Sequence, residues 1–466
     1  MLLAQARLLD ASTTTLLTGK NMSVNPNLKI FECGEYVAIF NGDDMTLKLL
    51  PLKKYSFSSQ GQTNLNSVLP VHASEIYKNE GKIDERPAIH RLSLNVSNLC
   101  NMACKYCYAN GGNYYTNGML MDKRTAFNSV NFAYRNFSAI ELINFFGGEP
   151  TLNEEIIELV CEFCIYLHAK GMMPYLPRFG LTTNGYIISS RMFDLLRRYN
   201  FSVSVSTDGP KMIHDKFRIS KEHSGTFDAV ANNIRSIIRM GIIPEFECTY
   251  TSEHYRMGID LAALMDFFYD NFGCRTLHCP MVIAESNSPL PVPLNTAVRL
   301  YSDAIRYSIH NLMDGVPKSI SIATRLLNNL TNRIPIYHYC PAGKSSITVN
   351  ADGNIYACFM LMRGRGFCFG NVNGDCHEFG NPNVIGILLE NADKWKDPDC
   401  QSCWAKSLCF GCLGEDIARG GTAIQRSVIL GQSGICDSKR KLIEVFLMSV
   451  ADAYVREETK QEEACL

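Results

Sequence analysis

Cys100, Cys104 and Cys107 stand close together in the sequence, separated first by three residues and then by two. Three thiols at this spacing can wrap one loop around an iron-sulfur cluster, and they leave one iron of a four-iron cluster without a protein ligand. An open iron is a place where chemistry can occur. A zinc site normally has a fourth Cys or His nearby, but the next histidine in this chain is His168.

A second group of cysteines lies towards the C-terminal end. Cys340 and Cys358 flank a turn at 351–353, which predicts a hairpin that brings these two thiols together. The group continues with Cys400, Cys403, Cys409, Cys412 and Cys436. Taken alone, this segment suits a zinc ribbon as well as it suits iron-sulfur clusters.

Strands and helices must position the first three cysteines. Apolar strand-like runs alternate with helical patterns, at 92–96, 140–146, 179–183, 201–206, 244–250 and 276–282. Six such repeats predict an α/β fold with a parallel sheet, whose site lies at the carboxyl ends of the strands. Cys161 and Cys164 lie in the predicted helix from Asn153, its expected cap, to Lys170, and are interpreted as packing residues.

Glycine and polar residues follow these strands. Gly147-Gly148-Glu149-Pro150 follows the second strand, where the glycines would let a ligand approach the backbone and Glu149 offers a negative charge. The other candidates at strand ends are Thr183, Asn184, Ser206, Asp208 and Arg218. We therefore expect them on one face of the sheet.

Composition restricts the class of protein. With 466 residues the chain is long enough for two or three domains. The 45 basic and 46 acidic residues almost cancel, which argues against nucleic acid or a membrane surface as a partner. No signal peptide or membrane span is predicted. We expect a cytoplasmic protein whose 19 cysteines serve metal binding or catalysis rather than disulfides.

With Tyr106 in its last interval, the first cysteine stretch closely resembles the CxxxCxYC motif of the radical S-adenosylmethionine (SAM) enzymes. The GGEP stretch about 40 residues later, and a segment from Ser206 to Arg218 similar to SxDGPxxxHDxxR of peptide-modifying members, strengthen the resemblance. It implies a partial (β/α)6 TIM-like barrel. In that family the cluster binds SAM at its free iron and cleaves it to a 5'-deoxyadenosyl radical.

The resemblance also implies site residues. Cys100, Cys104 and Cys107 would hold the catalytic cluster, Glu149 the SAM amino group and Arg218 the SAM carboxylate. The full set of implied SAM contacts is Tyr106, Gly147, Gly148, Glu149, Thr183, Asn184, Ser206, Asp208 and Arg218.

The C-terminal cysteines strongly resemble the SPASM extension, which holds further 4Fe-4S clusters. By this resemblance Cys400, Cys403, Cys409 and Cys436 bind a distal cluster, and Cys340, Cys358 and Cys412 bind a near one. The interval from Cys409 to Cys412 is one residue shorter than in the family. The near cluster is either open at one iron or closed by Cys368 or Cys376, and an open iron could bind a substrate thiolate.

Residues 1–90 contain strand-like runs at 27–31, 36–41 and 46–50, which predict a small meander. The segment resembles the winged-helix-like peptide-recognition domain of enzymes that modify ribosomal peptides, where a leader peptide adds as a strand. We therefore expect a leader-binding domain at 1–90, a barrel at 91–315, and a bridging region with a SPASM domain at 316–466.

Together these features predict a thioether-forming maturase of a ribosomally synthesised peptide, of the sactipeptide or ranthipeptide class and similar to freyrasin-type maturases. Three 4Fe-4S clusters, SAM, a precursor peptide and a flavodoxin- or ferredoxin-type electron donor would be its cofactors and partners. One alternative is a sulfatase-type maturase that forms formylglycine. The other is a non-catalytic metal-binding scaffold.

Overall fold

The computed structural model describes residues 26–33, 36–51, 86–284, 287–363, 365–374, 382–418 and 434–464. Its largest element is a ten-stranded sheet, in which β4 to β10 lie side by side in chain order and run parallel. These strands are β4 Ile89–Ser97, β5 Ile140–Gly147, β6 Arg178–Thr183, β7 Ser202–Ser206, β8 Glu245–Glu247, β9 Thr276–His278 and β10 Ser319–Ile320.

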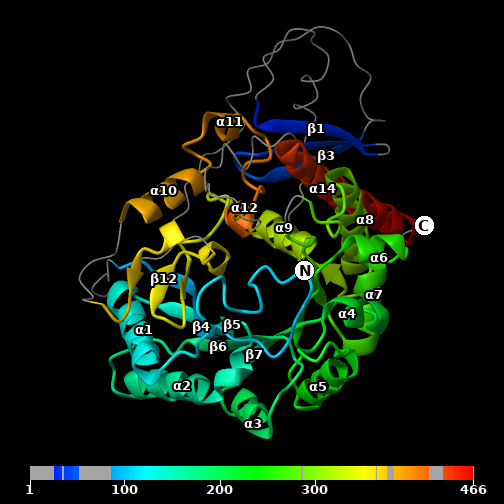
Figure 1. The fold of residues 1–466 in the computed structure, drawn as a ribbon. Helices are drawn as coiled ribbons and strands as arrows, with labels where there is room; N and C mark the ends of the chain where they lie inside the picture. The colour runs from blue at the N-terminus through cyan, green and yellow to red at the C-terminus, as the bar shows by residue number, and fades with distance from the viewer. Residues whose placement is uncertain are drawn as a thin grey trace.

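Helices cover the outside of this sheet. Figure 1 shows α1, α2, α3, α5 and α7 in a ring around the strands β4 to β7. The helices up to residue 272 are α1 Lys123–Asn136, α2 Glu154–Ala169, α3 Ser190–Arg198, α4 Lys211–Phe217, α5 Phe227–Arg239, α6 Ser252–Arg256 and α7 Leu261–Phe272. Those that follow are α8 Leu294–Met313, α9 Ser321–Asn332, α10 Pro382–Ala392, α11 Pro398–Gln401, α12 Glu415–Ala418 and α14 Ile435–Ala464. Short 3-10 helices span Pro150–Asn153, Phe359–Leu361 and Arg365–Phe367.

The predicted α/β fold with a parallel sheet is confirmed. Each of the six expected strand runs corresponds to one strand from β4 to β9. Alternation along β4 separates apolar Leu92, Leu94 and Val96, which belong to the hydrophobic core, from Ser93 and Asn95 on the opposite face. The face that is not packed against helices is therefore polar at its centre.

One helix start differs from the expectation. Asn153 occupies the N-cap position of α2, but its side chain makes no capping hydrogen bond. Its amide instead donates to the carbonyl oxygens of Val96, at 2.8 Å, and Met121, at 3.0 Å. Asn153 thus fixes the end of β4 to the start of α2, close to the cysteine loop.

The sheet continues beyond the barrel strands into the C-terminal part of the chain. β11 Ser346–Val349 runs parallel to β4 and pairs Ile347 with Leu92. β12 Asn354–Tyr356 returns antiparallel to β11, as the predicted hairpin requires, and β13 Gly370–Asn371 adds to its edge. Because β12 leads directly to Cys358, its pairing through β11 places this thiol beside β4, near Arg91.

A separate sheet of three antiparallel strands lies near the N-terminus. It consists of β1 Leu28–Cys33, β2 Tyr36–Asn41 and β3 Thr46–Pro51, as the predicted meander requires. In Figure 1 these strands lie beside α14, far from α2 and α3, and Lys29 pairs with Glu444 of α14 at 3.0 Å. The helices expected of a winged-helix-like domain would fall in 52–85, outside the described residues.

None of the helices among the described residues has both the length and the apolar composition that a membrane crossing requires.

Candidate active site and cysteine groups

The first three cysteines lie on a loop that leaves the carboxyl end of β4. The amide of Cys107 donates to the carbonyl oxygen of Cys104 at 3.2 Å, and the thiol of Cys107 is close enough for its charge to contribute to raising the pKa of both Cys100 and Cys104. Burial is the larger cause, and it raises these pKa values to about 11 and about 12. Backbone hydrogen bonds from Ala103 to Ile219 and from Lys105 to Phe217 fix the loop to the segment after α4.

Gly147 and Gly148 pack directly against the cysteine loop. A Cβ atom on Gly147 would lie 2.2 Å from the carbonyl oxygen of Ser97, and one on Gly148 would lie 2.3 Å from that of Leu99. The amides of Gly148 and Glu149 donate to these same oxygens, at 2.7 and 2.8 Å. We expected the glycines to make room for a ligand, whereas in the structure the room is filled by the backbone of the cysteine loop.

Glu149 is fully buried, and its carboxylate joins the loops that follow β5 and β6. Its carboxylate accepts from the Thr183 hydroxyl at 2.6 Å and from the Asn184 amide at 2.7 Å, both at the end of β6. It also accepts from the hydroxyl and amide of Thr151 at 2.9 and 3.2 Å. Burial raises the pKa of Glu149, while these donors act in the opposite direction.

Asn184 connects this network to the first cysteine. Its side-chain amide donates to Oδ1 of Asn101 at 2.8 Å and contacts the Cys100 sulfur at 3.6 Å. Glu149, Thr183 and Asn184, three of the residues singled out from the sequence, therefore form one network that reaches Cys100.

Tyr106, Asp208 and Arg218 form a second network on the other side of the loop. The Arg218 Nε donates to Asp208 Oδ1 at 2.9 Å, and the Tyr106 hydroxyl donates to Asp208 Oδ2. The Arg218 guanidinium also lies 5.5 Å from the centre of the Tyr106 ring. Arg218 contacts Asp208 through its Nε. Its two Nη groups could therefore donate side by side to the carboxylate of a ligand.

Several polar atoms beside the cysteine loop are buried without a partner among the described residues. They are Oδ1 of Asn95, both side-chain polar atoms of Asn98 and Nδ2 of Asn101. Asn98 is 1% exposed. Buried polar groups are almost always hydrogen-bonded, so these atoms fit a polar ligand bound at the loop. Ser206, the last residue of β7, is half-buried at the same end of the sheet.

The seven C-terminal cysteines divide into two neighbouring groups. The charges of Cys340 and Cys358 contribute, after burial, to raising the pKa of Cys412. The charges of Cys403 and Cys436 likewise contribute to raising the pKa of Cys409. Those of Cys409, Cys400 and Cys403 act to raise the pKa of Lys394, so these thiols lie near its ammonium. The three-cysteine group is thus Cys340, Cys358 and Cys412, and the four-cysteine group is Cys400, Cys403, Cys409 and Cys436.

These thiols are neighbours, yet in the described part of the chain no three Cys, His, Asp or Glu side chains are arranged to hold a single metal ion. The soft, reduced donor set suits iron-sulfur ligation. Cys368 donates to the carbonyl oxygen of Gly370 at 3.2 Å and packs in an aromatic cluster with Tyr356. Cys376, the other thiol that could complete the three-cysteine group, lies outside the described residues.

An aromatic cluster joins the first cysteine loop to the three-cysteine group. Tyr108, which follows Cys107, lies 6.3 Å from Phe359, which follows Cys358. Phe359 stacks on Phe146 of β5 with a separation of 4.6 Å between ring centres, and Tyr108 packs edge-on against Tyr114 at 6.1 Å. The first cysteine loop and the three-cysteine group therefore border the same aromatic wall, formed by Tyr108, Phe146 and Phe359. The spacing of these residues in the sequence could not reveal that they are close.

The four-cysteine group has a buried cation that the sequence did not point to. Lys394 is 0% exposed, and its Nζ donates to the carbonyl oxygens of Lys406, at 2.5 Å, and Cys409. Burial lowers the pKa of Lys394 to about 8, although the neighbouring thiols act to raise it. The only signal in the sequence was its position shortly before Cys400, which is weak because exposed lysines are common.

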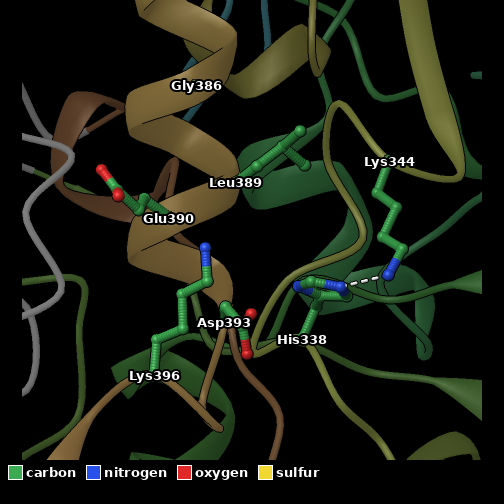
Figure 2. Close-up of a pocket in the computed structure, with 7 residues that line it drawn as sticks. All are labelled: His338, Lys344, Gly386, Leu389, Glu390, Asp393 and Lys396. Atoms are coloured by element: carbon green, nitrogen blue, oxygen red, sulfur yellow. Dashed lines mark hydrogen bonds between the residues drawn. The ribbon is translucent and has the colours of Figure 1, made fainter.

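The remaining cysteines and His338 fall outside these groups. Cys161 and Cys164 lie on α2 and are buried in the core, as predicted. Elsewhere in the chain, Cys248, Cys274 and Cys279 are also buried in the core. Figure 2 shows His338 at a cleft of about 500 Å³ beside α10, where its Nε2 accepts from Lys344. Burial, and secondly Lys344, lower the pKa of His338.

Comparison with known proteins places these features in a family context. Residues 94–252 match a family model described as the radical SAM superfamily. Over 393 residues the chain is 30% identical to a radical SAM cyclopropyl synthase, TigE, from Paramaledivibacter caminithermalis, a match that covers 78% of this chain and 75% of the relative. It is 26% identical over 329 residues to a cysteine-type anaerobic sulfatase-maturating enzyme from Clostridium novyi, covering 68% of this chain and 85% of the relative.

The fold also matches a solved structure, native anSMEcpe with bound AdoMet (SAM) and the Cp18Cys peptide. The TM-score is 0.63 at 19% identity, and the match covers 79% of this chain and 100% of that chain. At this low identity the match concerns the fold, and the fold it supports is the mostly parallel α/β barrel described above.

Proposed function

The chain belongs to the radical SAM superfamily, and from this premise we propose that it is a peptide maturase that forms thioether crosslinks. In this proposal the sulfur of a peptide cysteine becomes bonded to a carbon of another residue of the same peptide, with a side-chain carbon of Asp or Glu favoured over the α-carbon. The carbon would lose a hydrogen atom to the 5'-deoxyadenosyl radical, the thiol would lose its proton, and the remaining electron would pass to an auxiliary iron-sulfur cluster. The division of the seven C-terminal thiols into a group of three and a group of four is the observation that carries the proposal.

SAM and a 4Fe-4S cluster are the cofactors of the first site in this proposal. Cys100, Cys104 and Cys107 would hold the cluster, and the unpartnered polar atoms of Asn98 and Asn101 fit a polar ligand next to it. When bound, this pair of cofactors supplies a 5'-deoxyadenosyl radical, which can remove hydrogen from an unactivated carbon.

The chain's own residues would position these groups. Glu149 fixes the loops after β5 and β6 to each other and, through Asn184, to Cys100. Arg218, held by Asp208 through its Nε, would receive the SAM carboxylate with its two Nη groups. We retain Gly147, Gly148, Thr183, Ser206 and Tyr106 as residues that shape this site.

The three-cysteine group would place a second, incompletely ligated cluster near the first. Cys340, Cys358 and Cys412 supply three thiolates, and Cys368 is engaged with the Gly370 carbonyl in this structure. An iron without a protein ligand is soft and electropositive, and it suits a substrate thiolate. The aromatic wall of Tyr108, Phe146 and Phe359 would lie between the radical source and the held sulfur.

The four-cysteine group would hold the distal cluster of a SPASM domain, so the enzyme would contain three 4Fe-4S clusters. The N-terminal sheet would bind the leader of the precursor peptide, and a flavodoxin- or ferredoxin-type protein would supply electrons. We place the enzyme in the cytoplasm, because thiols that ligate iron must stay reduced.

The relatives favour two other outcomes for the same radical. The Clostridium novyi relative is named as a sulfatase-maturating enzyme, so formylglycine formation is the second candidate. The TigE relative is named as a cyclopropyl synthase, so ring closure between two carbons is the third. Neither outcome requires an iron that can bind a substrate thiolate.

Two cysteine variants test the proposal in anaerobically reconstituted enzyme. Cys100→Ala is expected to abolish the release of 5'-deoxyadenosine from SAM. Cys412→Ala is expected to retain this release, because the first site is intact, but to lose sulfur–carbon bond formation in the peptide. The buried thiol Cys164 provides the control, and Cys164→Ala should keep both activities per folded protein. A Cys412→Ala enzyme that still makes the crosslink would overturn the role assigned to the three-cysteine group.

A further inference from the structure

The turn between β2 and β3 contacts the loop that carries Cys400, Cys403 and Cys409 of the four-cysteine group. A Cβ atom on Gly42 would lie 2.2 Å from the carbonyl oxygen of Trp404. The Ser407 hydroxyl donates to the Gly42 carbonyl oxygen, and the Lys406 ammonium pairs with Asp43 at 2.9 Å. Trp404, Lys406 and Ser407 all lie between Cys403 and Cys409.

Apolar and charged contacts extend this interface on both sides of the turn. Phe40 of β2 is completely buried and packs edge-on against Trp404, with 6.5 Å between ring centres. Lys29 of β1 lies 5.3 Å from the centre of the same indole ring and pairs with Glu444 of α14. The indole of Trp404 is therefore covered by the N-terminal sheet.

Two buried lysines, Lys394 and Lys406, donate hydrogen bonds to backbone carbonyl oxygens of the loop from Cys400 to Cys409. Lys406 is 8% exposed, and besides pairing with Asp43 it donates to the carbonyl oxygen of Gln401 at 3.0 Å. Lys394 binds the carbonyl oxygens of Lys406 and Cys409 from the opposite direction. A single backbone conformation thus orients the thiols and presents Trp404, Lys406 and Ser407 to the sheet.

We propose that the four-cysteine site anchors the N-terminal sheet, with Lys406 and Ser407 as positioning residues. Cluster loading fixes the loop from Cys400 to Cys409, and the loop in turn fixes the sheet over the rest of the molecule. Because the two events share one backbone, each stabilises the other by the same free energy. The consequence for leader binding rests on the function proposed above for this sheet.

Gly42→Ala tests the anchor from the sheet side. The new methyl group cannot fit against the Trp404 carbonyl oxygen, so the turn must move away from the loop. Gly366→Ala is the matched control, because a Cβ atom there has no neighbour within 4 Å. Amide hydrogen exchange of the full-length, reconstituted protein is measured by mass spectrometry.

We expect Gly42→Ala to speed exchange in two segments that are distant in sequence, 28–51 and 400–412, and Gly366→Ala to change neither. Ser407→Ala, which removes one hydrogen bond and adds no bulk, should give the same pattern with a smaller amplitude. Faster exchange in 28–51 alone, or in neither segment, would overturn the proposal.

Cys409→Ala tests the coupling from the cluster side. We expect loss of iron from the distal site to speed exchange in 28–51, and the apparent KM for a leader-bearing peptide to rise more than kcat falls. A peptide without its leader should show no such rise in KM. Unchanged exchange in 28–51 after loss of the distal iron would contradict the anchor. If exchange changes but the intact enzyme does not distinguish the two peptides, the anchor stands and leader binding by the sheet is wrong.

Discussion

At the scale of single residues, the sequence identified side chains by their chemistry but not by their partners. Cys100, Glu149, Asp208 and Arg218 follow from motif and spacing alone. Their pairing does not, because Asp208 meets Arg218 and Tyr106 only when three loops converge. Lys394 was missed for a similar reason, since its position shortly before Cys400 does not indicate that its ammonium is buried.

His214 gives a residue-scale prediction about pH. It is fully buried between the hydroxyl groups of Thr207 and Thr226, at 2.9 and 3.0 Å, and burial lowers its pKa from 6.5 to about 4. Between these two pH values the unfolded chain binds a proton that the folded protein does not. Stability therefore falls as pH drops from 6.5 towards 4, by about 3 kcal/mol at most from this residue.

Replacing His214 by Gln should flatten this part of the stability profile, even though the variant is less stable at pH 7. The measurement is the free energy of unfolding from pH 4 to 7, compared with that of the parent enzyme. The exposed His168 supplies the control, and His168→Gln should keep the slope of the parent. Equal slopes for His214→Gln and the parent would show that folding does not lower the pKa of His214.

At the scale of elements, periodicity found the strands and helices, while close packing between loops stayed hidden. The runs that became β4 to β9 were long and apolar enough to read. β10 has only two residues and leaves no such pattern. The parallel pairing of β11 with β4 could not be predicted either, because it joins segments about 250 residues apart. The packing of the cysteine loop against Gly147 and Gly148 could not be predicted, because it depends on how two loops distant in sequence meet.

Gly148→Ala tests this packing. A methyl group there would collide with the Leu99 carbonyl oxygen and the Cα atom of Gly112, and would push the cysteine loop off β5. We expect the reconstituted enzyme to lose the iron of one cluster, about four atoms per chain, and to lose SAM cleavage with it. Gly386→Ala, which meets no atom within 4 Å on α10, should retain both. Full iron content in Gly148→Ala would mean that the loop does not depend on this contact.

At the scale of the whole molecule, the sheet brings together sites that lie far apart in the chain. β11 and β12 extend the barrel sheet from β4, and the ring of Phe359, which follows Cys358, lies 6.3 Å from that of Tyr108, which follows Cys107. The sequence predicted two cysteine groups of three, but their proximity depends on strand order. The docking of the N-terminal sheet on the four-cysteine loop was likewise beyond reach, because it depends on the surface contacts of Gly42.

The same arrangement explains why a sulfur-to-carbon bond is the product we favour. A radical generated at the first site and a thiolate held at the three-cysteine site would act on one peptide across the aromatic wall. Formylglycine formation and cyclopropane formation would need the radical from the first site but no thiolate held at the three-cysteine site. The products differ in the state of the peptide's thiols, which makes them separable.

The most direct test is the mass of the precursor peptide after co-expression with the enzyme, measured after reduction of any disulfides and again after treatment with a thiol-alkylating reagent. We predict a loss of two hydrogens for each crosslink, and that the cysteines involved resist alkylation. Peptide that has lost two hydrogens but alkylates at every cysteine would indicate carbon–carbon bond formation instead. An aldehyde in place of a cysteine, or an unchanged mass, would equally contradict thioether formation.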